Sequence, residues 1–246
     1  MLRLEFGSRR LRASWWMTAL TLVAVLLFVQ LGRWQWHRAD DKRHLSEAFA
    51  AGAGPATALG ARSSASLPRY VTVTVEGHYD GAHQFLLDNM SDGGQTGYEV
   101  LTPLGLADGR LLLVNRGWLA LPEGRRDRLP DIGLGPAASV SISGRLDEFP
   151  VTALQSGTAM PAADAPWPRR TSFPTAAQLG AALGQPVEAR QLLLAPGEAL
   201  GFRRQWRSAA AAFGPERHLS YAIQWWGFAA LALFLYLFMN LERNRP

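Results

Sequence analysis

Residues 219–241 read LSYAIQWWGFAALALFLYLFMNL, which is 23 positions without a charged side chain. A second charge-free run, ASWWMTALTLVAVLLFVQLG, fills 20 positions at 13–32. As helices rising about 1.5 Å per residue, both runs are long enough to cross the roughly 30 Å apolar core of a bilayer. These are the only two runs of this kind in the sequence. We therefore predict a membrane protein with two transmembrane α-helices that flank one large domain.

The first run could instead be a cleaved secretory signal. A signal core spans about 7–15 apolar residues and leads into a small-residue cleavage site. Here the run is longer, and the bulky segment LGRWQWHR at 31–38 closes it. We therefore expect an uncleaved anchor.

Arginine is concentrated in the two tails outside these runs. The positive-inside bias predicts that both tails are cytoplasmic, in a multi-pass protein of the bacterial inner (cell) membrane. The net charge of +5 then reflects tails held at anionic lipid headgroups, and it does not predict a nucleic-acid partner. The tail arginines are Arg3, Arg9, Arg10, Arg12, Arg243 and Arg245.

The region between the runs has the texture of a β domain. Residues 69–79 (RYVTVTVEGHY) alternate β-branched and polar side chains with period two, as a half-buried strand does. Asp108-Gly109 between two apolar segments is typical of a tight hairpin. We predict an extracytoplasmic α+β domain with a mainly antiparallel sheet or partly open barrel. The other expected strands are 84–89, 98–104, 110–121, 140–149 and a last one within 184–196, with a helix at 174–184 capped by Thr175.

The predicted boundaries follow from these patterns. Residues 50–68 are small, Gly/Pro-interrupted and almost uncharged, which is typical of a flexible linker. No internal repeat is present. The expected segments are 1–12 (cytoplasmic tail), 13–34 (first transmembrane helix), 35–68 (helical extension and flexible linker), 69–217 (sheet domain), 218–241 (second transmembrane helix) and 242–246 (cytoplasmic tail).

Several enzyme classes lack their signatures here. The chain has no cysteine, which excludes disulfides, C-x-x-C-H heme attachment and thiol chemistry. It has no G-x-S-x-G, P-loop, H-E-x-x-H or G-x-G-x-x-G motif. The segment GHYDGAHQFLLD places His78, Asp80, His83 and Asp88 close together, but exposed polar residues of a turn explain it better than an iron site. We expect no catalysis.

The segment Asn115-Arg116-Gly117-Trp118 ends a strongly apolar strand and allows two interpretations. In one, Gly117 permits a bulge or close packing, Trp118 covers the sheet and Arg116 faces solvent. In the other, the four residues form a surface for a protein partner, because Arg and Trp are enriched in binding hot spots. The sequence leaves both open.

Several segments in order resemble the Surfeit-locus family of cytochrome c oxidase assembly factors. The order, the spacing and the two charge-free runs carry the resemblance together, and it is weak at 50–68 and 150–200. The segments are LGRWQWHR at 31–38, EGHYD at 76–80, LLDNMSDGGQTGYEVLTPL at 86–104, LLVNRGWL at 112–119 and HLSYAIQWW at 218–226.

The resemblance implies a role in inserting or retaining heme a in subunit I of the oxidase. It also implies partners, namely subunit I and the heme a synthesis machinery. Some bacterial members bind heme a through a histidine at the start of the second span, and the matching position is His218. The first runner-up is a heme-free scaffold that stabilises an oxidase assembly intermediate, and the second is an unrelated two-span envelope protein that binds a ligand.

The residues themselves permit heme ligation at His218. On a helix, Tyr221 and Trp225 share its face at i+3 and i+7. A neutral imidazole is a normal axial ligand for heme iron. A histidine beside an interfacial aromatic belt would look the same without heme, and His37 is the competing ligand. The arginines expected to face the propionates are Arg33, Arg38, Arg203, Arg204, Arg207 and Arg217.

Overall fold

The computed structural model describes residues 2–6, 9–122, 128–134, 139–150, 160–208 and 214–243, with side chains from 13 to 241. It divides into two compact units, one made of Met1–Glu47 with Ser208–Pro246 and one made of Ala48–Arg207. Arg245 and the side chains of the other tail arginines lie outside the described part.

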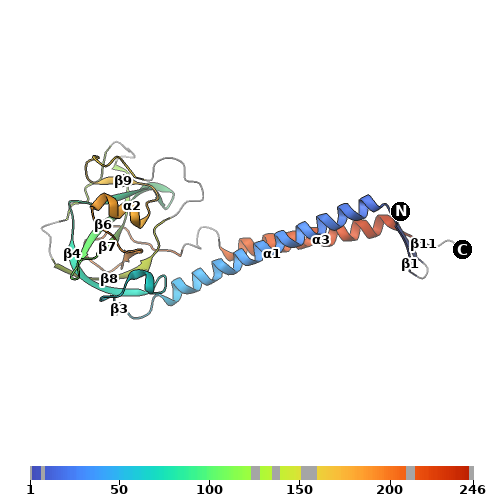
Figure 1. Ribbon diagram of the computed structural model, residues 1–246, viewed down its shortest axis with the longest axis horizontal. Helices are drawn as coiled ribbons and strands as arrows, with labels where there is room; N and C mark the ends of the chain where they lie inside the picture. The colour runs from blue at the N-terminus through green and yellow to red at the C-terminus, as the bar shows by residue number, and fades with distance from the viewer. Residues whose placement is uncertain are drawn as a thin grey trace. The chain divides into compact units, whose positions relative to one another are not determined.

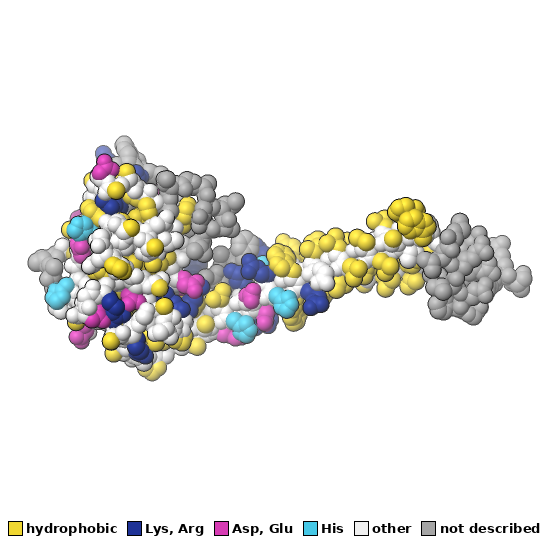
Figure 2. Space-filling model, in the orientation of Figure 1, with side chains coloured by type: hydrophobic (Ala, Val, Ile, Leu, Met, Phe, Trp, Pro, Cys, Tyr) yellow, Lys and Arg dark blue, Asp and Glu magenta, His cyan; other side chains and the backbone are white. Residues whose placement is uncertain are grey.

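Two long helices dominate the first unit and lie side by side in Figure 1. Helix α1 runs over Trp15–Ala51 and helix α3 over Pro215–Asn240. Both are long and apolar enough to cross a membrane, and only 6% and 11% of their apolar stretches are buried. So little burial argues against core helices of a water-soluble domain. Figure 2 shows how apolar side chains cover the pair, with charged and histidine side chains gathered on the later part of α1.

The helix ends follow local chemistry. Helix α3 begins three residues before the predicted span, because Pro215 suits the first helical position and Glu216 places a carboxylate near the positive end of the helix dipole. Helix α1 continues well beyond Gly32, as the predicted helical extension requires.

Short strands join the ends of the chain in the same unit. Strand β2 (Arg9–Ala13) pairs antiparallel with β1 (Leu2–Phe6) and with β11 (Leu241–Arg243). The amino- and carboxyl-terminal segments therefore lie together at one end of the helix pair, where Figure 1 marks both termini.

The second unit is a closed five-stranded barrel with additional strands at its edges. Around the barrel the strands follow the order β4-β8-β10-β7-β6, and pairing of His78 with Gly105 returns β6 to β4. Every ladder in the ring is antiparallel except β10 with β7. The strands are β4 Thr72–Tyr79, β5 Phe85–Asp92, β6 Gln95–Leu106, β7 Leu111–Ala120, β8 Ser139–Asp147 and β10 Gln191–Leu194, with β3 Thr57–Ala58 and β9 Arg169–Thr171 at the edges.

The mainly antiparallel sheet is confirmed, and the barrel is closed where the sequence suggested a sheet or a partly open barrel. The sequence does not predict closure, because the alternation of side chains identifies each strand separately. Closure depends on which strands pair with each other. A closed ring leaves few unpaired edges among its strands.

Successive residues of β7 belong to two apolar clusters. Leu112 and Val114 pack in the barrel interior with side chains from the other four strands of the ring. Leu113 points the other way and packs with Phe85 and with Leu179 of helix α2 (Ala176–Leu183). Helix α2 starts at the expected cap, where Thr175 and Gln178 form a reciprocal capping box.

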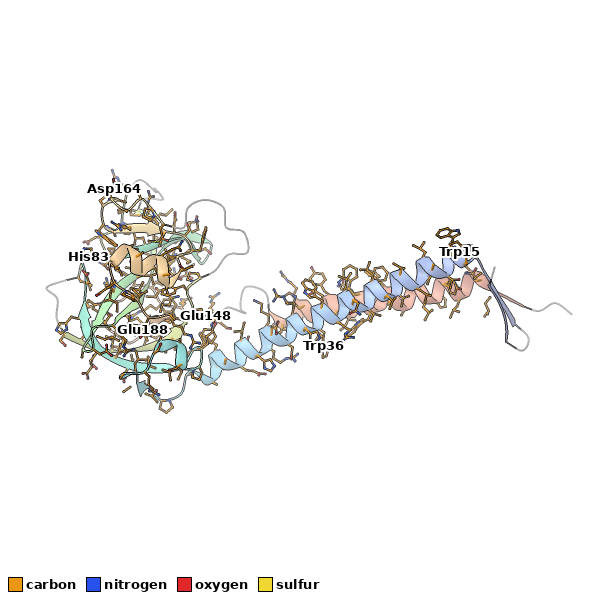
Figure 3. All side chains as sticks on the ribbon, viewed as in Figure 1. Trp15, Trp36, His83, Glu148, Asp164 and Glu188 are labelled. Atoms are coloured by element: carbon orange, nitrogen blue, oxygen red, sulfur yellow. The ribbon has the colours of Figure 1, made fainter. Side chains whose placement is uncertain are left out.

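Residues 52–68 contact the barrel through two buried residues, Leu59 and Ser64, although their composition is typical of a flexible linker. They contribute strand β3 and a short 3-10 helix, η1 (Ser64–Ser66), and the Leu59 side chain is buried in the barrel core. A carboxylate holds the segment in place, because Glu188 accepts a hydrogen bond from the Ser64 amide at 2.7 Å and pairs with Arg110. Figure 3 labels Glu188 within the barrel unit.

Candidate functional site

The helix pair is tied together by contacts along most of its apolar length. Near one end the Thr18 and Tyr236 hydroxyls lie 2.8 Å apart. In the middle the Phe28 ring stacks with Trp225 at 5.7 Å between centroids. Farther along, Trp226 covers Gly32 so closely that a Cβ there would lie 2.2 Å from the indole nitrogen. These contacts set the register of the two helices.

His218 lies in the first turn of α3 and is half-buried. Its Nδ1 is 2.8 Å from Oε1 of Gln35 on α1. An amide oxygen only accepts hydrogen bonds, so a neutral ring in this contact carries its proton on Nδ1 and its free lone pair on Nε2. Nε2 has no hydrogen-bond partner among the described residues. A neutral imidazole with one free nitrogen can serve as an axial ligand of heme iron.

The predicted aromatic face of α3 divides into two parts. Trp225 is half-buried in the helix pair, between Phe28 and Phe228, with the Trp225 and Phe228 rings 5.8 Å apart. Tyr221 is 45% exposed. The exposed ring of Tyr221 is therefore available to a ligand beside His218, whereas Trp225 already contributes to helix packing.

His37, the competing ligand, lies on the exposed surface of α1 and has no partner among the described residues. His218 and His37 thus differ in how their rings are held, because Gln35 contacts only the His218 ring. Arg33 is also exposed and without a partner in the described chain, which leaves its charge available to an anionic group. Three other candidate arginines, Arg203, Arg204 and Arg207, belong to the barrel unit. There Arg203 pairs with Asp92 at 2.7 Å and Arg204 donates to backbone carbonyls.

The structure places Asn115, Arg116 and Trp118 in the interior, at 0%, 2% and 8% exposure. The register between β6 and β7 shifts at this point, which is a β-bulge. Gly117 takes φ +112 there, and a Cβ would lie 2.7 Å from the Arg203 carbonyl oxygen. Close packing at Gly117 and a covering role for Trp118 agree with the first interpretation of this segment. The four residues do not form an exposed patch here, because Arg116 points into the barrel with Leu112 and Val114.

Arg116 has no carboxylate partner among the described residues. Its guanidinium donates to the Leu200 carbonyl at 2.7 Å, to Gln84 Oε1 at 2.9 Å and to the Ile132 carbonyl at 3.2 Å. It also lies over the Phe202 ring at 4.8 Å. Burial lowers the pKa of Arg116, and the neighbouring Tyr79 opposes that shift. Neutral acceptors thus hold a buried charge that ties two loops to the barrel.

A second polar network lies on the other face of the same strands. Asn115 donates to Glu99 at 2.7 Å and to Gln191 at 3.1 Å. Burial raises the pKa of Glu99, and the hydrogen bond from Asn115 only partly offsets this. Burial also raises the pKa of Asp147 against the attraction of Arg69, whose Nε lies 2.7 Å from the carboxylate. These contacts join strands, and they show no arrangement of nucleophile and base.

The histidine-rich turn is a local structure. His83 Nδ1 contacts Asp80 Oδ2 at 2.6 Å, and both side chains are about half exposed, at 48% and 41%. Figure 3 labels His83 within the barrel unit. No group of three or more metal-binding side chains occurs among the residues that the structure describes.

Sequence reasoning placed His218 correctly at the start of a helix but missed its partner as an orienting group. A signal was available, because Gln35 lies in LGRWQWHR and His218 opens HLSYAIQWW, two of the segments that carry the family resemblance. The interior position of Arg116 had no comparable signal.

The fold and the site together define a class, a closed β-barrel protein with two long apolar helices and an oriented, unblocked imidazole between them. The model of the SURF1 family matches residues 22–230, and the chain belongs to that family. Its members are assembly factors of cytochrome oxidase, a role linked to the handling of heme a. No curated protein matches the chain.

Proposed function

We propose that this protein is an assembly factor for a heme-copper (cytochrome c) oxidase, which assists delivery of heme a to subunit I or its retention there. Family membership over residues 22–230 supports the oxidase role. Subunit I and the heme a synthesis machinery are the expected partners. Heme a is cargo in this proposal, so a single protein ligand and an open helix face favour release.

The two helices act as membrane spans in this proposal. Their apolar side chains point outward, as Phe238 at 73% and Leu20 at 71% exposure illustrate, and lipid would cover them. The pairing of β2 with β11 brings both tails together, which supports one location for both termini. The arginine-rich tails favour the cytoplasm, so the barrel would lie outside the cytoplasm of a bacterial inner membrane.

The heme iron would bind Nε2 of His218. The observation that carries this assignment is the hydrogen bond of Nδ1 to Gln35, because it leaves Nε2 as the only free nitrogen of the ring. The exposed Tyr221 ring would contact the porphyrin, with Trp225 behind it in the helix pair. Arg33 offers a free guanidinium for a propionate. Heme a supplies the iron and the porphyrin, and the protein supplies ligation and orientation.

His218→Ala is the test of ligation, with His37→Ala as the matched control. Each full-length variant is purified from cells that synthesise heme a, and a reduced-minus-oxidised spectrum is recorded. We expect His218→Ala to lose the heme a spectrum at normal protein level and His37→Ala to keep it. Full heme content in His218→Ala would contradict ligation. A wild type without heme, in cells whose oxidase still depends on it, would favour the heme-free scaffold.

Topology has its own test. Reporters that distinguish the two sides of the membrane are fused at Gly54 and at the carboxyl terminus. We expect opposite sides, with the carboxyl terminus cytoplasmic. Two reporters on the same side would refute the two-span arrangement.

A further inference from the structure

We infer that Gln35 is the positioning residue of the heme site, because it selects the His218 tautomer that protonates Nδ1 and leaves Nε2 to the metal. The expected effect of Gln35 on heme binding rests on the proposed function. The hydrogen bond itself is a separate claim that can be tested without heme. The inference gives Gln35, a residue of the segment LGRWQWHR, a role that neither the family match nor the ligand assignment explains.

In a neutral imidazole, the position of the single proton determines which nitrogen can bind a metal. A neutral histidine carries one proton, which either nitrogen can hold, and the protonated nitrogen cannot coordinate a metal. In free solution the ring exchanges between both forms. An acceptor fixed beside Nδ1 holds the proton there and also fixes the plane of the ring. Metal-binding histidines generally have such a partner on the second nitrogen.

The packing of the helix pair places the Gln35 backbone where its side chain can reach His218. Gln35 is one turn beyond Gly32, the position that Trp226 covers. At Gly32 the absence of a side chain lets the indole approach the α1 backbone. That close approach brings Gln35 within 2.8 Å of a ring that is 183 positions away in the chain. Both side chains are half-buried, so water competes weakly for the bond.

The chain supplies a matched control on the same helix. Gln30 is exposed on α1 and has no partner among the described residues. Gln35→Leu and Gln30→Leu make the same chemical change and leave both helices apolar, so membrane insertion should be equal. Gln35→Glu keeps an acceptor beside Nδ1 and makes it a stronger one.

The first experiment measures heme binding by the full-length protein in nanodiscs. Apoprotein is titrated with heme a, and bound heme is followed by its absorption spectrum and its midpoint potential. Loss of a second-sphere partner typically weakens metal binding about 10–100-fold, so we expect a change of that size for Gln35→Leu and none for Gln30→Leu. Gln35→Glu should bind heme and lower its midpoint potential, because a more basic imidazole favours ferric iron.

The second experiment needs no heme. The apoprotein is labelled with ¹⁵N-histidine, and the His218 signals are assigned by comparison with His218→Ala. We expect wild type and Gln30→Leu to show a protonated Nδ1 and a free Nε2, and Gln35→Leu to show a mixture of both tautomers. A protonated Nε2 in wild type would mean that the amide nitrogen of Gln35 faces the ring, and the inference would be overturned.

The two experiments separate the possible failures. If the tautomer is as expected but Gln35→Leu binds heme as wild type does, Gln35 does not position the site. If wild type and His218→Ala bind heme equally, the proposed ligation fails, and a role of Gln35 in it fails with it. The ¹⁵N result would still report whether the Gln35–His218 hydrogen bond exists.

Discussion

The barrel and the helix pair differ in where they place apolar and polar side chains. The barrel encloses Asn115 and Arg116 almost completely, in the strands whose neighbouring positions supply the apolar core. The helix pair leaves Phe238 and Met239 exposed at 73% and 68% and joins its helices through Thr18, Tyr236, Gln35 and His218. Polar groups are therefore interior in one unit and placed near the two ends of the apolar stretch in the other.

This contrast is what the proposed membrane location of the helix pair predicts. In water, apolar side chains gain by burial, and a barrel can also enclose charge if every donor finds an acceptor. In lipid, apolar side chains lose nothing by facing outward, and helices associate by close packing and a few polar contacts. Four predictions probe this contrast, and they run from the largest effect to the smallest.

Gly117→Ala should cost the barrel the most, about 3–4 kcal/mol, because strain at φ +112 adds to a clash with the Arg203 carbonyl oxygen. The Trp118 amide donates to that oxygen at 2.8 Å, so the backbone cannot move away freely. Gly109→Ala is the control, since Gly109 has φ +86 but open space around it, and about 1 kcal/mol is expected. Urea titration in micelles, followed by near-ultraviolet circular dichroism, measures both. Equal losses would show that close approach contributes nothing.

Arg116→Met should destabilise the barrel by about 3 kcal/mol, since buried acceptors on two loops lose their donor. The control is Arg145→Met, at a half-buried arginine that donates to the Phe49 carbonyl at 3.0 Å. There about 1 kcal/mol is expected. The same urea titration compares them. An Arg116→Met variant with the wild-type free energy of unfolding would show that the interior charge does not stabilise the barrel.

Glu99→Gln should stabilise the barrel near neutral pH by about 1 kcal/mol, the scale of one side-chain hydrogen bond. Burial raises the pKa of Glu99 in the folded state, so the folded protein binds a proton at the Glu99 carboxylate more tightly than the unfolded chain does. Protonated Glu99 therefore contributes to the free energy of unfolding in full below its unfolded-state pKa, and this contribution is lost as pH rises through its folded-state pKa. Unfolding at pH 4 to 8 should therefore show a shallower decline in Glu99→Gln. Glu76→Gln, at an exposed carboxylate of β4, should leave the wild-type slope.

Thr18→Val should have the smallest effect, because a hydrogen bond between membrane helices contributes about 0.6 kcal/mol. The bond joins the Thr18 and Tyr236 hydroxyls. Unfolding of the helix pair in mixed micelles by added dodecyl sulfate measures the loss. The control is a double-mutant cycle with Tyr236→Phe, in which the second substitution should cost almost nothing more. Additive losses would show that the two hydroxyls do not interact.

Local patterns predicted the elements of the barrel well. Strands β4 and β8 match the predicted 69–79 and 140–149 within a few residues, because alternation with period two records which side chains face the core. Thr175 marked the start of α2 because a cap acts within one turn.

Residues 50–68 show where local patterns mislead. Their composition indicates a linker, yet Leu59 is in the core and Ser64 is held by Glu188, which is 124 positions away. The same applies to the segment 115–118, where Arg116 was expected in solvent or on a partner surface. A charged residue is buried only if acceptors arrive from elsewhere, and here they arrive from Gln84, Ile132 and Leu200.

Local sequence patterns were sufficient to predict the two long apolar helices, the strands of the sheet and the histidine at the start of the second helix. Those features depend on transfer free energies and backbone preferences that add residue by residue along a short segment. Three features became visible only in the folded chain: the barrel closes between β4 and β6, Arg116 lies inside it, and Gln35 meets His218. Each of these requires two segments far apart in the chain to reach one register, and the packing of Trp226 on Gly32 sets that register in the helix pair.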